Sequence, residues 1–171
     1  MDVYEAIESR ASVRDFTDED VPSSTVKNFL ETAVRAPTAG NLQPWRFYVV
    51  RDRDVKKGLC EAAWGQPCVE QAPVVIVVCA ELEVCSSGYG SRGEGLYAIQ
   101  DTAAAVENIL LAIVAEELGA CWVGAFNEEA ASEVLILPEG IRPLAMVPIG
   151  HPAGKQRRTG REPFENYTKY L

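Results

Sequence analysis

Histidine is nearly absent from this 171-residue chain, in which His151 is the single example. One imidazole leaves little material for a histidine-rich metal site or for a histidine that activates a neighbouring nucleophile. The GxSxG motif of α/β-hydrolases does not occur either. A histidine-based metal site and a serine hydrolase triad are therefore not indicated.

Paired cysteines are also lacking, because the five cysteines are an odd number and contain no CxxC motif. This arrangement indicates neither a disulfide framework nor a zinc or iron–sulfur site. We expect no bound metal, and we interpret the cysteines as free, buried thiols. They are Cys60, Cys68, Cys79, Cys85 and Cys121.

Long uninterrupted apolar runs are absent as well. The run PVVIVVCA at 73–80 is too short to span a bilayer, and the apolar stretch 96–118 is interrupted by acidic residues. The first eight residues are acidic and amphipathic, unlike a secretory signal. We expect a cytoplasmic protein with no membrane contact.

Positive charge is scarce, since 16 basic residues stand against 25 acidic ones and the net charge is −9. Nucleic-acid binding needs a basic face, so no nucleic-acid partner is expected. The basic residues are concentrated at the end, where residues 151–171 hold five basic residues and two acidic ones. Such a tail suggests docking onto the acidic body or onto an anionic ligand, or it is simply a solvated terminus.

The composition predicts one globular domain over residues 1–171, in which residues 151–171 form an extended basic C-terminal tail. Hydrophobic residues make up 47% of the chain and charged residues 24%, which suffices for a sizeable core. No internal repeat or domain linker is visible.

The hydrophobic pattern predicts both helices and strands. Ser23 or Ser24 is expected to cap a helix that Pro37 stops, and Gly119 is expected to end another helix. The run 72–78 lacks polar alternation, which favours a central strand covered on both faces. The expected fold class is α+β, with a central sheet of about four strands. Helices are expected over 2–8, 23–36, 52–63, 96–118 and 128–135, strands over 45–50, 72–78, 120–126 and 142–150, and a mobile loop over 86–95.

The stretch SRASVRDF places Arg10, Ser12 and Arg14 at every second position. In an extended segment these three side chains share one face, and Ala11 and Val13 share the other. Two guanidinium groups that flank a hydroxyl are good ligands for a phosphate.

Residues 88–93 formally match G-x-G-x-x-G, but their context argues against a dinucleotide-binding Rossmann site. The first glycine of that motif stands directly after a strand, whereas seven residues separate Ala80 from Gly88. The next helix also begins too late. A flexible glycine-rich loop is the better interpretation.

The segment APTAGNLQPW at 36–45 follows a helix end with small residues, two amides and a proline. Such a loop can bring backbone groups close to a flat ligand, while Asn41 and Gln43 offer donors and acceptors. Taken alone, an ordinary polar turn explains this segment equally well.

These stretches occur in one order with three others, and together they resemble the FMN-dependent nitroreductase family. The others are the helix YAIQDTAAAVENILLAIVAEELG, the strand ACWVGAF and the ending VPIGHPAGKQRRTGREP. The resemblance covers nearly the whole chain. It implies a three-layer fold, with a central mixed, mainly antiparallel sheet flanked by helices. It also implies a homodimer that binds FMN in clefts at the subunit interface.

The resemblance assigns phosphate-binding roles to both ends of the chain. Arg10 and Ser12 would hold the FMN phosphate and ribityl chain, and Arg161, with Arg158 as the alternative, would reach the phosphate from the C-terminal tail. Ala11 stands where relatives often have a basic residue or histidine, so one phosphate contact is expected to be missing.

The resemblance places three other groups of residues at the flavin ring. Arg14 would lie near the pyrimidine end of the ring and stabilise the negative charge of the reduced flavin. The strand would lie against the ring with a backbone amide directed to N5, and the loop would contact the flavin of the partner subunit. The strand residues are Val123, Gly124 and Ala125, and the loop residues are Pro37, Thr38, Ala39, Asn41 and Gln43.

The implied activity is ping-pong hydride transfer from NADH or NADPH through FMN N5 to a nitroaromatic, quinone or similar small-molecule acceptor. No side chain has to act as a nucleophile, which agrees with the single histidine. Some relatives instead remove halogens from aromatics or oxidise azolines, and FMN binding without turnover is a further alternative. The chain lacks the long insertions that some relatives use as lids, which leaves residues 86–95 to cover the cleft.

Overall fold

In the computed structural model, which describes residues 1–154, 156 and 158–171, four strands form one sheet. All strand pairs of this sheet are antiparallel, and one isolated parallel bridge joins Ser12 to Ala120. The expected mainly antiparallel sheet is therefore confirmed. The strands, in the spatial order β1-β2-β4-β3, are β1 (Trp45–Val50), β2 (Val74–Glu81), β4 (Ile141–Gly150) and β3 (Gly119–Ala120).

Strand β2 lies at the centre of the fold, between β1 and β4. Its residues from Val74 to Ala80 have no exposed surface. Six of these seven residues are valine, isoleucine or alanine, and the β-branched ones suit a pleated strand that is covered on both faces. The expectation of a central, fully covered strand is confirmed.

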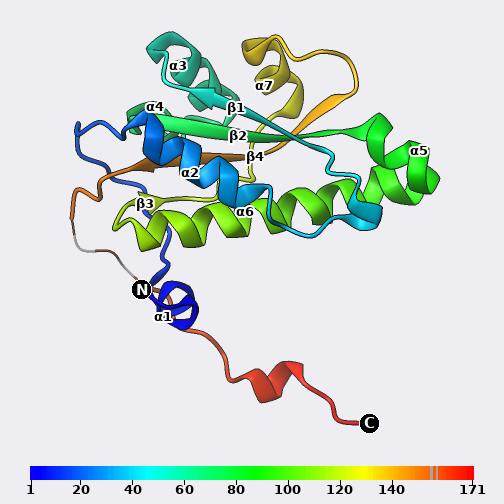
Figure 1. Ribbon diagram of the computed structural model, residues 1–171. Helices are drawn as coiled ribbons and strands as arrows, with labels where there is room; N and C mark the ends of the chain where they lie inside the picture. The colour runs from blue at the N-terminus through cyan, green and yellow to red at the C-terminus, as the bar shows by residue number, and fades with distance from the viewer. Residues whose placement is uncertain (155, 157) are drawn as a thin grey trace.

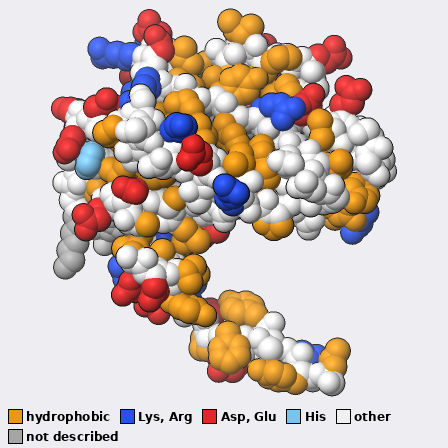
Figure 2. Space-filling model, in the orientation of Figure 1, with side chains coloured by type: hydrophobic (Ala, Val, Ile, Leu, Met, Phe, Trp, Pro, Cys, Tyr) orange, Lys and Arg blue, Asp and Glu red, His pale blue; other side chains and the backbone are white. Residues whose placement is uncertain are grey.

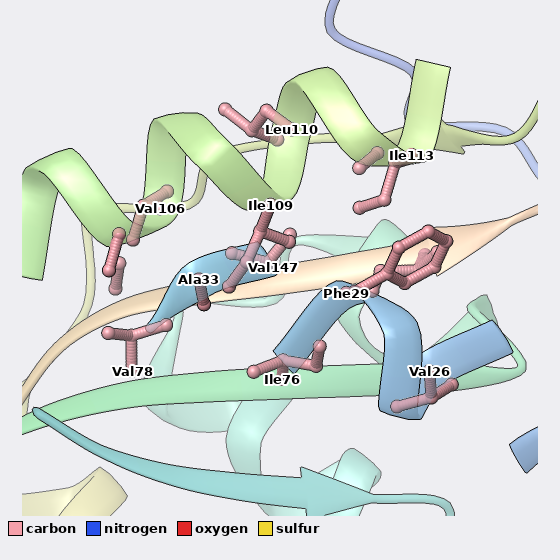
Figure 3. Close-up of a cluster of buried hydrophobic side chains, with 14 of the residues drawn as sticks. Val26, Phe29, Ala33, Ile76, Val78, Val106, Ile109, Leu110, Ile113 and Val147 are labelled. Carbon is pink, nitrogen blue, oxygen red and sulfur yellow. The ribbon is translucent and has the colours of Figure 1, made fainter. Parts of the chain in front are cut away.

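Helices α2 (Ser23–Ala33) and α6 (Ala98–Ala115) cover one face of the sheet (Figure 1). Figure 3 shows Phe29 of α2 and Ile109 of α6 among the strand residues Ile76 and Val147, and all four are fully buried. Each large apolar side chain buried in this way stabilises the fold by roughly 1.5–3 kcal/mol.

Three helices cover the opposite face: α3 (Arg53–Ala62), α4 (Pro67–Gln71) and α7 (Glu128–Leu135). The three-layer arrangement is confirmed. Helix α4 was not predicted, because five residues are too short to show a hydrophobic period. Its C-terminal end is held by Lys56, whose buried Nζ donates to the Ala72 carbonyl at 2.6 Å.

The N-terminal helix and the C-terminal segment both lie below this three-layer body, and the C-terminus itself lies well away from the N-terminus (Figure 1). Helix α1 (Val3–Ser9) begins with a capping box in which Asp2 and Glu5 bond each other's backbone amides. The short helix η3 (Phe164–Tyr167) belongs to a C-terminal arm, residues 161–171, that projects away from the body. Helix α1 and an extended tail were both expected.

The largest correction concerns residues 86–95, which were expected to form a mobile loop. They belong to helix α5 (Leu82–Arg92), which is kinked at Tyr89 and Gly90, and to the single-turn π-helix η2 (Gly93–Tyr97), which continues into α6. Glycine makes this tight winding possible, because a Cβ on Gly93 would lie 2.1 Å from the Cys85 carbonyl oxygen. Gly90, at φ 56° and ψ −145°, lies at the kink, and Gly93 allows the close approach of the turn that follows it.

Two predicted helix ends are also wrong. Pro22, with no side-chain cap, precedes α2, so Ser23 and Ser24 already lie inside the helix. Helix α6 ends through Glu117, which adopts the left-handed conformation at φ 59°, and Gly119 lies in β3. The residues that flank these helix ends are therefore Pro22 and Glu117, and the predicted cap residues lie one or two positions further along the chain.

The expected strand 120–126 is mostly irregular. Only Gly119 and Ala120 form a strand with β4, and beyond them Val123 makes an isolated bridge to Met146. The chain thus leaves the sheet edge after two residues, and Gly124 and Ala125 are exposed.

Among the described residues, one helical run is long and apolar enough to cross a membrane by length and composition, namely Leu82–Ala115. A buried core helix meets the same criterion. The α6 part of this run packs its residues Ile109 and Ile113 against the sheet.

Candidate functional site

The N-terminal segment that carries Arg10, Ser12 and Arg14 is extended and lies along β3. Ser12 forms the parallel bridge to Ala120, and the Val13 amide donates to the Ala120 carbonyl at 2.8 Å. Val13 is buried, whereas Ser12 and Arg14 are exposed. The expected alternation of side chains is confirmed from Ser12 to Arg14, whereas Ala11, expected on the opposite face with Val13, is half-buried and lines the same cavity as Arg10 and Ser12.

Gly119 allows this segment to approach the sheet edge. A Cβ at this position would lie 2.8 Å from the Cβ of Val13 and from both of its methyl groups. Any larger residue would therefore push Val13 outward and displace the polar face that alternates with it.

Residues from both ends of the chain line one cavity of about 630 Å³. Arg10, Ser12 and Arg14 come from the N-terminal segment, and Arg158 and Arg161 come from the C-terminal tail. Ala11 and Thr159 also line it. The chain thus brings together four arginines that are up to 151 positions apart in the sequence.

The charge of this cavity suits an anion. Four guanidinium groups line it, and they outnumber the two carboxylates that also line it, those of Glu8 and Glu107. Guanidinium groups form paired, charge-assisted hydrogen bonds to phosphate oxygens, and an exposed serine hydroxyl adds another donor. The residues present therefore fit the phosphate of a nucleotide cofactor such as FMN. Lys155 and Arg157 of the basic tail lie outside the described residues.

A buried thiol lies beside the arginine-lined cavity. The Cys121 thiol donates to the Trp122 carbonyl at 3.7 Å, and Cys68 and Ser12 lie near its sulfur. The neighbouring Cys68 thiol and the positive charge of Arg14 lower the pKa of the Cys121 thiol, although burial acts in the opposite direction. The five cysteines are all free and buried, as expected, but sequence reasoning did not place any of them beside Arg14.

The predicted ring-binding residues Val123, Gly124 and Ala125 follow β3 directly. Val123 is fixed by two backbone hydrogen bonds of 2.9 Å to Met146, and its side chain is buried. The Ala125 carbonyl accepts from Gln66 Nε2 at 2.9 Å, which ties this segment to the turn before α4. The exposed backbone of Gly124 and Ala125 is therefore held from both sides.

The predicted loop Pro37–Gln43 lies elsewhere, near the start of α6. The Ala39 amide donates to the Asp101 carboxylate in the first turn of that helix, whereas Glu107, in the middle of the helix, lines the arginine-lined cavity. Asp101 and Glu107 are about 9 Å apart along the helix axis, yet none of the loop residues lines the cavity. The loop residues Pro37, Asn41 and Gln43 are exposed, and Thr38 and Ala39 are half-buried.

Sequence reasoning missed two residues that hold the predicted site in place, Asp101 and Gln66. Asp101 could have been noticed as a lone carboxylate within a mostly apolar helical stripe. Gln66 carries no comparable signal, because nothing in the sequence relates it to Ala125, 59 positions later.

The chain is similar to known flavin and nicotinamide enzymes. The sequence model of the nitroreductase family matches residues 7–69 and 61–151. A Thermus thermophilus protein named NADH dehydrogenase is 36% identical in an alignment of 192 positions, gaps included, which covers 96% of this chain and 94% of that protein. A Bacillus subtilis protein named FMN reductase (NAD(P)H) is 30% identical over 177 residues, covering 96% and 71%.

Two further comparisons extend this picture. An iodotyrosine deiodinase of Haliscomenobacter hydrossis is 27% identical over 177 residues, covering 88% of this chain and 79% of that protein. The crystal structure of a nitroreductase family protein from Clostridium novyi is 33% identical, with a TM-score of 0.79 and coverage of 89% and 86%. On the strength of these similarities and of its fold, the chain belongs to the nitroreductase family.

Proposed function

We propose that this protein is an FMN-dependent NAD(P)H oxidoreductase that acts as a homodimer on a small-molecule acceptor. The observation that carries the proposal is the cavity in which Arg10, Ser12, Arg14, Arg158 and Arg161 converge from both ends of the chain. Relatives named for FMN reduction and for NADH dehydrogenation support the same assignment.

The phosphate of FMN fits the cationic part of this cavity. Arg10 and Ser12 hold it from the N-terminal segment, and Arg161, or Arg158 in its place, holds it from the tail. The acidic body would otherwise repel a dianion, since the chain carries a net charge of −9. Clustering the arginines at one point overcomes that repulsion locally.

FMN, when bound, supplies the redox chemistry by accepting a hydride from NAD(P)H and passing electrons to the acceptor. The chain's own residues orient and tune the ring. Arg14 places a fixed positive charge beside it and so favours the reduced, negatively charged form. The exposed backbone at Gly124 and Ala125 offers amide donors to the ring edge, and no side chain acts as a nucleophile.

A second copy of the chain completes the site in this proposal. Because none of the residues of the loop Pro37–Gln43 lines the arginine-lined cavity of its own chain, the loop is left to contact a flavin in a partner subunit. The ends of the chain also expose apolar side chains that a dimer would cover: Tyr4 is 75% exposed and Tyr167 is 77% exposed. Figure 2 shows such side chains in orange along the projecting C-terminal arm.

The visible spectrum of the freshly purified protein tests the proposal. We expect a yellow dimer whose flavin absorbance bleaches on anaerobic mixing with NADH or NADPH and returns when a nitroaromatic or quinone is added. A colourless protein that takes up no added FMN would refute the proposal. Bound FMN that neither nucleotide reduces would identify a flavin-binding module without turnover.

A dehalogenase is the second candidate, because one relative is named iodotyrosine deiodinase. Iodide release from iodotyrosine by the reduced protein would support it, whereas reduction of nitroaromatics without iodide release supports the first candidate. The cytoplasmic location and the single domain over residues 1–171 stay predictions.

A further inference from the structure

Asp101 is a buried carboxylate that holds a distant loop. It lies in the first turn of α6 and is 6% exposed. Both of its oxygens accept from the Ala39 amide, at 3.1 and 3.2 Å, across 62 positions of sequence. Burial raises the pKa of this carboxyl, and the hydrogen bond from Ala39 opposes that effect. Among the described residues, Asp101 forms no ion pair with a lysine or an arginine.

Helix capping does not explain this carboxylate. An acidic residue in a first turn usually serves the free amides of a helix N-terminus. Helix α6 has no such free end, because the π-helix η2 runs directly into it and the Ala98 amide already bonds the Gly93 carbonyl. Asp101 instead directs its oxygens out of the helix, to Ala39.

The loop that Asp101 holds has an uncommon backbone. Gly40 and Asn41 have φ of 56° and Gln43 has φ of 53°, a region that costs energy for residues with a side chain. From the other side, helix α5 packs against the loop: a Cβ on Gly40 would lie 2.7 Å from the Tyr89 hydroxyl, and Leu42 contacts Gly88. The loop is thus held between Asp101 and α5.

Stability alone does not account for Asp101. A buried charge without a cationic partner is costly, and a hydrophobic residue of similar volume often stabilises such a position. The Asp101 carboxylate can instead favour the one loop conformation in which the Ala39 amide donates to it.

We propose that Asp101 is a positioning residue, which fixes the loop Thr38–Gln43 in the conformation that binds the cofactor. This inference rests on the proposed function, in which that loop contacts the FMN of the partner subunit. A loop released from Asp101 spends only part of its time in the competent conformation. The apparent affinity for FMN falls by that fraction.

Three variants of the full-length protein test this role. Asp101→Leu removes both acceptors, Asp101→Asn retains one, and Thr102→Val is the matched control. Thr102 is buried beside Asp101, but its hydroxyl bonds only carbonyls of its own helix, those of Ala98 and Ile99. The measurements are the Kd for FMN by fluorescence titration, the unfolding temperature, and hydrogen exchange of the peptide 37–44 without FMN.

For Asp101→Leu we expect faster exchange in the peptide 37–44 and FMN binding weakened about tenfold or more, with an unchanged or higher unfolding temperature. Asp101→Asn should lie between this variant and the wild type, and Thr102→Val should retain FMN affinity and slow exchange. Unaltered exchange in Asp101→Leu, or a loss of FMN affinity that only follows a fall in unfolding temperature, overturns the positioning role. A wild-type protein that binds no FMN overturns the proposed function instead, and the exchange data then still decide whether Asp101 fixes the loop.

Discussion

At the residue scale, arginine chemistry accounts for the candidate site. Arg10, Arg14, Arg158 and Arg161 line one cavity although they come from opposite ends of the chain. Arg14 has a second neighbour in Cys121, whose thiol pKa it lowers. One guanidinium group therefore acts on a buried thiol and, in the proposed function, on the flavin ring.

Replacing Arg10 by alanine should weaken FMN retention. Hydrogen bonds to charged groups contribute roughly 1.5–3 kcal/mol, so we expect the Kd to rise about ten- to a hundredfold. Dialysis followed by absorbance of the retained flavin measures this change. Arg35→Ala is the control, because Arg35 is an exposed arginine that lies after α2 and does not line the cavity. Equal flavin retention in the two variants would contradict the assignment of Arg10.

Replacing Arg14 by alanine should change the flavin's redox properties more than its binding. Removing a positive charge beside the ring disfavours the negatively charged reduced form, so the midpoint potential should fall and reduction by NAD(P)H should slow. Spectroscopic redox titration measures the potential, and Arg14→Lys should recover part of the loss because it keeps the charge. A potential that is the same in all three proteins would remove Arg14 from this role.

At the scale of elements, glycine decides how the segment 82–97 is built. Composition favours a loop there, yet Gly93 lets the π-helix η2 pack directly onto the Cys85 carbonyl, and the helix continues into α6. Gly119 has an equivalent role at β3, where it admits Val13. In both places glycine serves a close approach of two segments, not chain flexibility.

Two glycines of the π-helix η2 provide a matched test of this view. Gly93→Ala should lower the free energy of unfolding by about 1–3 kcal/mol or more, because its Cβ would overlap the Cys85 carbonyl. Gly95→Ala meets no atom within 4 Å and should be neutral, or stabilising by up to about 1 kcal/mol, since alanine favours helix. Urea unfolding of both variants decides, and similar stabilities would disprove the packing argument.

At the scale of the whole molecule, one chain carries two parts of the proposed flavin site, the arginine-lined cavity and the loop Pro37–Gln43, that are not in contact within one cavity. None of the residues of the loop Pro37–Gln43 lines the arginine-lined cavity, and the C-terminal arm projects from the body with exposed aromatic side chains. Both features are accounted for if two copies assemble and exchange contacts.

Removing residues 164–171 should therefore weaken dimerisation while leaving Arg158 and Arg161 in place. We expect the truncated protein to shift toward a monomer in size-exclusion chromatography with light scattering, and to lose FMN affinity in parallel. Ile136→Asn is the control: Ile136 is 87% exposed with φ of 53°, a conformation that asparagine tolerates, and it follows α7 on the other side of the sheet. A truncated protein that stays dimeric and yellow would exclude the arm from assembly.

The amino-acid sequence by itself determined the features that depend on neighbouring residues. The unbroken apolar run of β2, the hydrophobic stripes of α2 and α6, and the alternation of Arg10, Ser12 and Arg14 follow from local periodicity, which sequence displays directly. The resemblance to the nitroreductase family was carried by such short ordered stretches, and the family comparison confirmed it.

The tertiary structure alone decided the features that depend on residues far apart in the chain. Asp101 accepts a hydrogen bond from Ala39, and Gln66 donates one to Ala125, each across about sixty positions of sequence. The charge of Arg14 acts on Cys121 because the N-terminal segment pairs with β3. Such contacts form when packing brings elements together, so periodicity and composition carry no trace of them. The same packing gives residues 86–95 helical structure on both sides of a kink at Tyr89 and Gly90, where local propensity favoured a loop.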